Sequence, residues 1–257
     1  MTPEQILLIF VSSIGGGIMN ALAGGGTILT YPALLFAGES AITANATSTI
    51  ALWPGAATSL FGYRREVRAN AGWLKVLFFP SLLGGAIGAV LLLATPAKIF
   101  EGLAPFLVLF ATVLFMLQGF LSRHAPTNAD PGLGRPGRVF VATLFQLGIG
   151  IYGGYFGAGI GILMLAVLGF MGLADIHAAN GVKNFFGMCI NGVAAAWFIF
   201  RGAVDWPAAL IMIAGAMIGG YAGAHFARRI GRARARAAVV VIGLMVAAIL
   251  LWRQSRV

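Results

Sequence analysis

The chain has 257 residues, of which 60% are hydrophobic and 9% are charged, and its mean hydropathy is +0.93. Because about a quarter of the residues of a soluble domain are charged, this composition excludes a soluble globular protein and indicates an integral membrane protein. The formal net charge is +10. We expect no nucleic acid as a partner, because the arginines stand at the ends of apolar segments, where they orient a membrane protein and contact anionic lipid.

Long apolar segments follow one another along the whole chain. We expect all of them to be helical, because a helix satisfies its own backbone groups in lipid and the two-residue alternation of barrel strands is missing. No Lys or Arg precedes the first segment, so it does not read as a cleaved signal peptide, and we expect it to be retained. The predicted segments are 5–36, 42–62, 73–94, 99–121, 139–171, 178–200, 207–227 and 237–252.

Two of these segments, 5–36 and 139–171, are too long for one upright crossing, since about 20 residues span the hydrocarbon layer. Each contains closely spaced glycines near its middle. Each is therefore either one tilted helix or two pieces that fold back at the glycines. The positive-inside rule favours folding back, because that arrangement gathers most arginines on one face and leaves both termini on the other.

The second half of the chain repeats landmarks of the first. Gly24 and Gly157 are separated along the sequence by the same interval as Trp73 and Trp206. We therefore predict an all-α polytopic membrane protein built from two homologous halves that are inverted repeats. Each half has a glycine-broken first segment, re-entrant if it folds back, followed by three transmembrane helices. The predicted halves are residues 1–121 and 139–257, joined by a polar linker, 122–138, that is rich in turn residues.

Duplicated halves with broken membrane segments are typical of secondary transporters, and the breaks mark the substrate site. A break frees backbone N–H groups, and the half-helix after it points its positive end into the break, which suits an anion. Close helix packing is the other common role of such glycines, and we assign it to those within 84–88 and 219–223. The helix after each break opens with polar side chains. The predicted substrate-binding residues are Gly24, Gly25, Gly26, Thr27, Asn45, Thr47, Ser48, Gly157, Gly159, Asn180, Lys183 and Asn184.

Lys183 is the strongest candidate, because an ionisable group inside an apolar segment is costly and usually marks a pathway or a paired partner. The alternative is that it lies near the helix start and extends to the membrane interface. Asp175 and His177 precede this helix and are candidates for carrying protons, although Asp175 fits equally well as a helix N-cap. Glu39, on the corresponding turn of the first half, is expected to be solvated. We assign no function to His124, His225 or Cys189.

The sequence argues against an enzyme. It has no His, Asp and Glu cluster with metal-ligand spacing, no Walker lysine and no nucleophile with a paired base. We therefore expect no metal, no cofactor and no ATP-driven pump. Transport would draw on an ion gradient or on the gradient of the substrate itself.

The glycine run 21–27, the helix start 44–48 and the second-half counterparts 150–161 and 178–180 resemble the TauE/SafE family of membrane proteins, also called sulfite exporters. The resemblance implies a multi-pass carrier of the prokaryotic inner membrane that exports small sulfur-containing anions such as sulfite or organosulfonates. The second-half helix start departs from the first, because it lacks the Thr-Ser pair of residues 47–48.

Two other classes of function stay open, an anion channel without alternating access and a membrane scaffold that transports nothing. The expected partners are the small anion and the lipid bilayer, and the helix-packing glycines permit a homodimer without requiring one.

Overall fold

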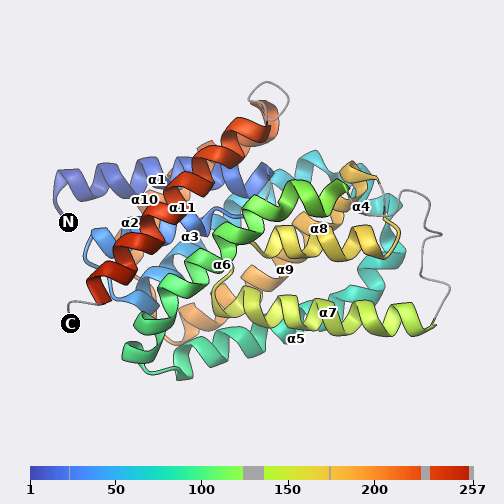
Figure 1. Cartoon of the computed structure of the whole chain (residues 1–257), viewed down its shortest axis with the longest axis horizontal. Helices are drawn as coiled ribbons and strands as arrows, with labels where there is room; N and C mark the ends of the chain where they lie inside the picture. The colour runs from blue at the N-terminus through green and yellow to red at the C-terminus, as the bar shows by residue number, and fades with distance from the viewer. Residues whose placement is uncertain (23, 124–135, 174, 227–231, 255–257) are drawn as a thin grey trace.

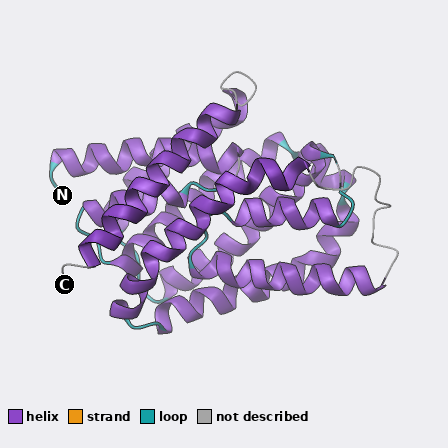
Figure 2. Ribbon diagram, viewed as in Figure 1, coloured by secondary structure: helices purple, strands orange, loops and turns teal. Residues whose placement is uncertain are grey.

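The structure is a computed structural model that describes residues 1–22, 24–123, 136–173, 175–226 and 232–254. All regular elements among these residues are helices, as Figure 2 shows. The helices are α1 (Pro3–Leu22), α2 (Thr27–Phe36), α3 (Ala41–Gly62), α4 (Arg64–Ala69), α5 (Ala71–Ala94), α6 (Ala97–Arg123), α7 (Pro136–Tyr155), α8 (Ile160–Phe170), α9 (Ile176–Phe200), α10 (Trp206–Phe226) and α11 (Arg232–Gln254).

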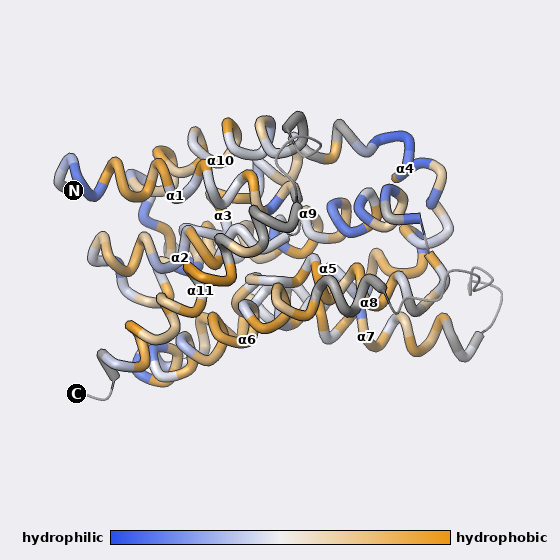
Figure 3. Tube along the Cα trace, turned by 45° about the horizontal axis from the view of Figure 1, so that its top comes forward, coloured by the Kyte–Doolittle hydropathy of each residue, from blue (hydrophilic) through white to orange (hydrophobic). Residues whose placement is uncertain are grey.

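The predicted all-helical fold is confirmed. Within the described residues α1, α5, α6, α9 and α10 are long and apolar enough to cross a membrane, and α2, α8 and the apolar parts of α7 and α11 are shorter. The sequence did not predict α4, which Figure 3 shows as a hydrophilic stretch at one end of the molecule. Most of the predicted linker lies outside the described residues, and its last residues, 136–138, belong to α7.

Both over-long segments are broken at their glycines. The first divides into α1 and α2 and the second into α7 and α8. Gly24, Gly157 and Gly159 have φ angles of 79°, 80° and 80°, a left-handed conformation that glycine adopts without the clash of a β-carbon. These residues end the first helix of each pair and allow the chain to change direction.

The first broken segment folds back on itself. Gln5, at the start of α1, donates a hydrogen bond of 2.9 Å from Nε2 to the carbonyl oxygen of Ala37, just after α2. The end of α2 therefore lies beside the beginning of α1. In Figure 1, α1 runs inward from the N-terminus and α2 returns toward the same end of the molecule.

The second broken segment does the same from the opposite end. Leu163 of α8 lies against the same surface hollow as Leu144 and Gly148 of α7, and Figure 1 shows the two helices side by side. Tyr152 closes the turn between them by donating a hydrogen bond of 2.7 Å to the carbonyl oxygen of Ala158. Both termini of the described chain lie at one end of the molecule, as the folded-back arrangement requires.

Glycines on α5 and α10 allow close contact with the first helix of the other half. A β-carbon at Gly150 of α7 would lie 3.0 Å from the Cα of Gly84 on α5, and one at Gly223 of α10 would lie 2.9 Å from the Cα of Ile18 on α1. Each half thus packs its broken helix on a long helix of the other half. The internal repeat stays a prediction, and this exchange of partners supports it.

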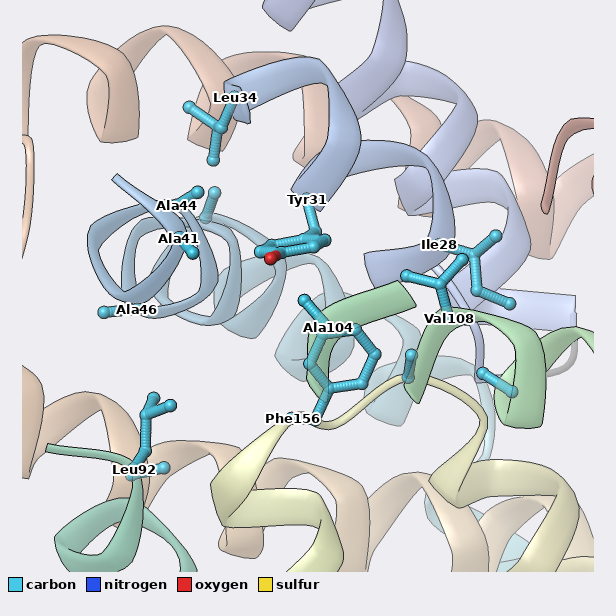
Figure 4. Packing of buried hydrophobic residues seen from close by; sticks show 14 of the residues in the cluster. Ile28, Tyr31, Leu34, Ala41, Ala44, Ala46, Leu92, Ala104, Val108 and Phe156 are labelled. Atoms are coloured by element: carbon cyan, nitrogen blue, oxygen red, sulfur yellow. The ribbon is translucent and has the colours of Figure 1, made fainter. Parts of the chain in front are cut away.

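Aromatic rings fill the space between α2, α6 and the second break. The ring of Tyr31 meets that of Phe156 edge to face at 5.3 Å and that of Phe100 at 6.5 Å. All three side chains are buried, and Figure 4 shows Tyr31 between α3 and α6, with Phe156 beneath it. Large apolar side chains such as Phe79, Phe200 and Tyr221 instead face outward, where lipid would surround them.

Enlarging a glycine at the contact between α5 and α7 should destabilise the fold. Gly150→Leu places a side chain against the backbone of α5, and overpacking of this kind costs about 1–3 kcal/mol. We expect the melting temperature in detergent to fall by several degrees, measured by the intrinsic fluorescence of the tryptophans.

Gly148→Leu is the matched control. Gly148 lies on the same helix as Gly150, and a β-carbon there would meet nothing within 4 Å. Equal melting temperatures of the two variants would show that the contact between α5 and α7 is not tight.

Candidate functional site

The two breaks lie against each other in the interior. A β-carbon at Gly24, in the first break, would lie 2.8 Å from the Cα of Gly161 at the start of α8. One at Gly157, in the second break, would lie 3.9 Å from Oγ1 of Thr27, the first residue of α2. The N-terminal ends of both half-helices therefore meet at one place, although the sequence separates them widely.

Both half-helices begin without a side-chain cap. The N-cap residues, Gly26 of α2 and Gly159 of α8, are glycines and have no side chain that could accept hydrogen bonds from the first turn. The first N–H groups of a helix have no partner within the helix, and they carry its partial positive charge. Two such ends at one point form a favourable environment for an anion.

A small cavity of about 20 Å³ lies at this meeting point. Room for one water molecule takes about 10–15 Å³ on the same measure. Residues of α1, α2, α3, both breaks, α8 and α9 form the wall. They are Asn20, Gly24, Thr27, Thr49, Leu52, Ala56, Gly157, Ile160, Gly161, Met164, Lys183, Asn184, Gly187 and Asn191.

Lys183 places a cationic side chain in this wall. It comes from the first part of α9, and only 2% of its surface is exposed. The alternative that it extends to the membrane interface is therefore wrong for this structure. An ammonium group held among apolar helices favours negatively charged or hydrogen-bonding neighbours, and an anion in the cavity would be such a neighbour.

Two asparagines of α9 bring unsatisfied polar atoms to the same wall. Nδ2 of Asn184 and Oδ1 of Asn191 are buried and have no hydrogen-bond partner among the described residues. The Asn184 side chain is 6% exposed. A buried polar atom without a partner costs about 1–3 kcal/mol, and a ligand with hydrogen-bonding oxygens would remove that cost at Asn184.

Five of the predicted binding residues meet at the cavity. They are Gly24, Thr27, Gly157, Lys183 and Asn184. The other predicted glycines serve packing: the ring of Phe115 fills the space beside Gly25, Gly26 lies against the backbone of Gly16, and Gly159 faces Ala111.

The polar residues of α3 mostly bind protein groups. Asn45 donates from Nδ2 to the carbonyl oxygen of Tyr155 at 2.9 Å, and Thr47 Oγ1 accepts from the Asp205 amide at 3.1 Å. The Ser48 hydroxyl forms a hydrogen bond of 2.5 Å with that of Thr30. Asn180 is 5% exposed and is not part of the cavity wall.

The structure also places three other polar residues in the wall, Asn20, Thr49 and Asn191. Thr49 and Asn191 lie on α3 and α9, the helices that follow the breaks and that the sequence showed to open with polar side chains. The signal that could have found Asn20 is its position in the last turn of α1, directly before the first break.

Asp175 acts as a helix cap. Its Oδ1 accepts hydrogen bonds from the amides of His177 at 2.7 Å and Ala178 at 3.4 Å, and both Asp175 and His177 are exposed. Among the described residues no group of three His, Cys, Asp or Glu side chains is arranged to hold a metal ion. His124 lies outside the described residues, and Cys189 is a half-buried free thiol.

These features define a multi-pass helical membrane protein of the transporter class, in which two broken helices meet at a polar interior cavity. The family profile described as "Sulfite exporter TauE/SafE" matches residues 8–250. The chain belongs to this family.

Relatives named as transporters match over nearly the whole chain. "Probable membrane transporter protein ORF9" of Sinorhizobium sp. is 28% identical over 247 residues, 94% of this chain and 90% of the relative. A "Probable membrane transporter protein" of Haemophilus influenzae is 27% identical over 256 residues, 98% of this chain and 96% of the relative. The relative named YfcA of Escherichia coli is 25% identical over 259 residues, 98% of this chain and 91% of the relative. No solved structure matches the chain.

The contact between the breaks can be tested by adding one methyl group. Gly24→Ala introduces a β-carbon in a left-handed conformation and also against Gly161. The conformation costs about 1–2 kcal/mol and the overpacking about 1–3 kcal/mol more. We expect a clear fall in melting temperature and in the yield of monodisperse protein.

Gly38→Ala separates the two effects. Gly38 also has a positive φ, of 100°, but a β-carbon there meets nothing within 4 Å. An equal loss of stability in both variants would contradict close contact between the two breaks.

Proposed function

We propose that this protein is a secondary carrier of small anions that exports sulfite or an organosulfonate across the bacterial inner membrane by alternating access. The anion would lie in the cavity between the two half-helices. The N–H groups at the starts of α2 and α8 and the Asn184 amide would donate hydrogen bonds, and Lys183 would balance its charge.

The observation that carries this proposal is the burial of Lys183 beside two uncapped helix starts. A cation and two positive helix ends are gathered at one interior cavity, and together they favour negative charge there. A bound anion would interact favourably with all three.

The size of the cavity supports a carrier over an open channel. About 20 Å³ has room for one or two water molecules, whereas a sulfur oxyanion carries several oxygens around its sulfur. The described state is thus closed around the site, and the anion needs a movement of the two halves to enter or leave. Alternating access in transporters with broken helices uses such a movement.

Binding can be tested without knowing the substrate. We expect one of sulfite, sulfate, thiosulfate, sulfoacetate or taurine to raise the melting temperature of the purified protein selectively. A ligand at a hundred times its Kd stabilises the folded state by about 2.7 kcal/mol. The shift should disappear in Lys183→Ala.

Lys75→Ala is the control, because Lys75 is an exposed cation on α5 and does not line the cavity. It should keep the full shift. Loss of the shift in both variants would indicate general electrostatic binding, and a full shift in Lys183→Ala would place the anion elsewhere.

Counterflow separates the carrier from the two other classes. Vesicles loaded with unlabelled substrate should take up labelled substrate faster than empty vesicles if the protein is a carrier. A channel gives no such acceleration, and a scaffold gives no protein-dependent uptake.

A further inference from the structure

A larger hollow opens at the end of the molecule that holds both termini. We call it the vestibule. It has a volume of about 600 Å³, and α2, the turn after it, the start of α3, α6 and α11 form its wall. Its charged residues are Glu39, Lys98 and Glu101, and α11 contributes the apolar Leu250.

Tyr31 separates the vestibule from the two breaks. It lines the vestibule, and its ring packs against Phe156 of the second break. Its hydroxyl group is buried and has no hydrogen-bond partner among the described residues. The Tyr31 side chain thus lies between the vestibule wall and the second break.

A pair of acidic side chains joins the two halves beside this vestibule. Glu39, on the turn between α2 and α3, forms a side-chain hydrogen bond with Asp205, on the loop before α10. We call these two residues the carboxyl pair. Ionised carboxylates only accept hydrogen bonds, so this bond exists only while one of the two groups holds a proton.

The surroundings favour that proton. Partial burial raises the pKa of the Glu39 carboxyl above its usual range, and the hydrogen bond with Asp205 and the negative charge of Asp205 raise it further. Lys98 and Glu101 on α6 are the other charged groups of the vestibule wall, and they carry opposite charges. The direction of the shift means that acid favours the bonded pair and that the bond is lost as the pH rises through the raised pKa.

Asp205 is also fixed to the first half by its backbone, because its amide donates to Thr47 Oγ1 at 3.1 Å. The loop before α10 is therefore held at two points, one permanent and one that depends on a proton. Alternating access requires the halves to move relative to each other. A proton-dependent bond between them restricts that movement.

We propose that the carboxyl pair is a proton-binding site that regulates transport by joining the two halves at the vestibule when it is protonated. The inference rests on the proposed carrier function. The proton comes from water in the vestibule and forms an O–H bond on one carboxylate oxygen of the pair, and it returns to water when the pair ionises. The two negative charges then repel each other and free the halves to move.

Exchange of radiolabelled sulfate and sulfoacetate in vesicles tests this regulation. The pH is kept equal inside and outside, so the orientation of the protein does not matter, and both anions keep their charge from weakly acidic to weakly alkaline pH. The wild-type protein should exchange slowly in acid and severalfold faster in alkali.

Two substitutions of the pair have opposite expected effects. Glu39→Gln retains a donor, because the amide N–H groups bind the ionised Asp205 at any pH, so exchange should be slow throughout. Asp205→Ala removes the bond, so exchange should be fast throughout. Glu4→Gln, an exposed carboxyl on α1, should keep the wild-type profile. A wild-type profile in Glu39→Gln or Asp205→Ala would overturn the proposal.

Infrared difference spectroscopy during a pH titration tests the proton site without any transport. The wild type should lose a protonated-carboxyl band as the pH rises through the transition seen in exchange, and Glu39→Gln should lack that band. A band unchanged in Glu39→Gln would overturn the proton site even if anions exchange. Absence of exchange with both anions in every variant would instead contradict the carrier function, and the regulation with it, while the infrared band still reports whether the pair holds a proton.

Discussion

Every backbone N–H and C=O group within a membrane must find a partner inside the protein, because lipid offers none. A helix interrupted in its middle violates this requirement at the interruption. This chain interrupts two helices, at residues 22–27 and 155–160, and places the interruptions against each other in the interior. The rest of the structure follows from the need to give hydrogen-bond partners to the backbone groups at these two breaks and to bury them.

Several polar residues serve the backbone that the breaks expose. Asn45 donates to the carbonyl of Tyr155, the last residue of α7, which no longer has a helical partner. Thr30 and Ser48 join α2 to α3 just after the first break. These bonds cross between elements and make each half-helix part of a fixed framework. The first residues of α2 and α8, Thr27, Ile160 and Gly161, lie in the cavity wall with Lys183 and Asn184. The same constraint thus accounts for the hydrogen bonds around the breaks and, on the proposed function, for an anion in the cavity.

The sequence predicted the helices, the two breaks and a lysine within the membrane interior, because clustered glycines interrupt a membrane helix and a cation in an apolar segment is costly to bury. The sequence alone could not distinguish side chains that would bind a ligand from side chains that bond to other groups of the protein. A binding face on a helix would show the same residue types and spacing as Asn45, Thr47 and Ser48. Only the three-dimensional contacts show that these side chains bond to protein groups. Glu39 was expected to be solvated, because its partner Asp205 comes from the other half and no local pattern connects them. The short helix α4 was missed because its polar residues give no apolar period.

The central claim is that an anion binds between the two half-helices at Lys183. Selenate and selenite are heavier analogues of sulfur oxyanions, so crystals of the protein soaked in either one and measured at the selenium absorption edge test the claim directly. The account predicts an anomalous peak within hydrogen-bonding distance of Lys183 Nζ and of the first amides of α2 and α8, and no such peak in Lys183→Ala crystals. A peak confined to the vestibule, or one that persists between the breaks in Lys183→Ala, would contradict it.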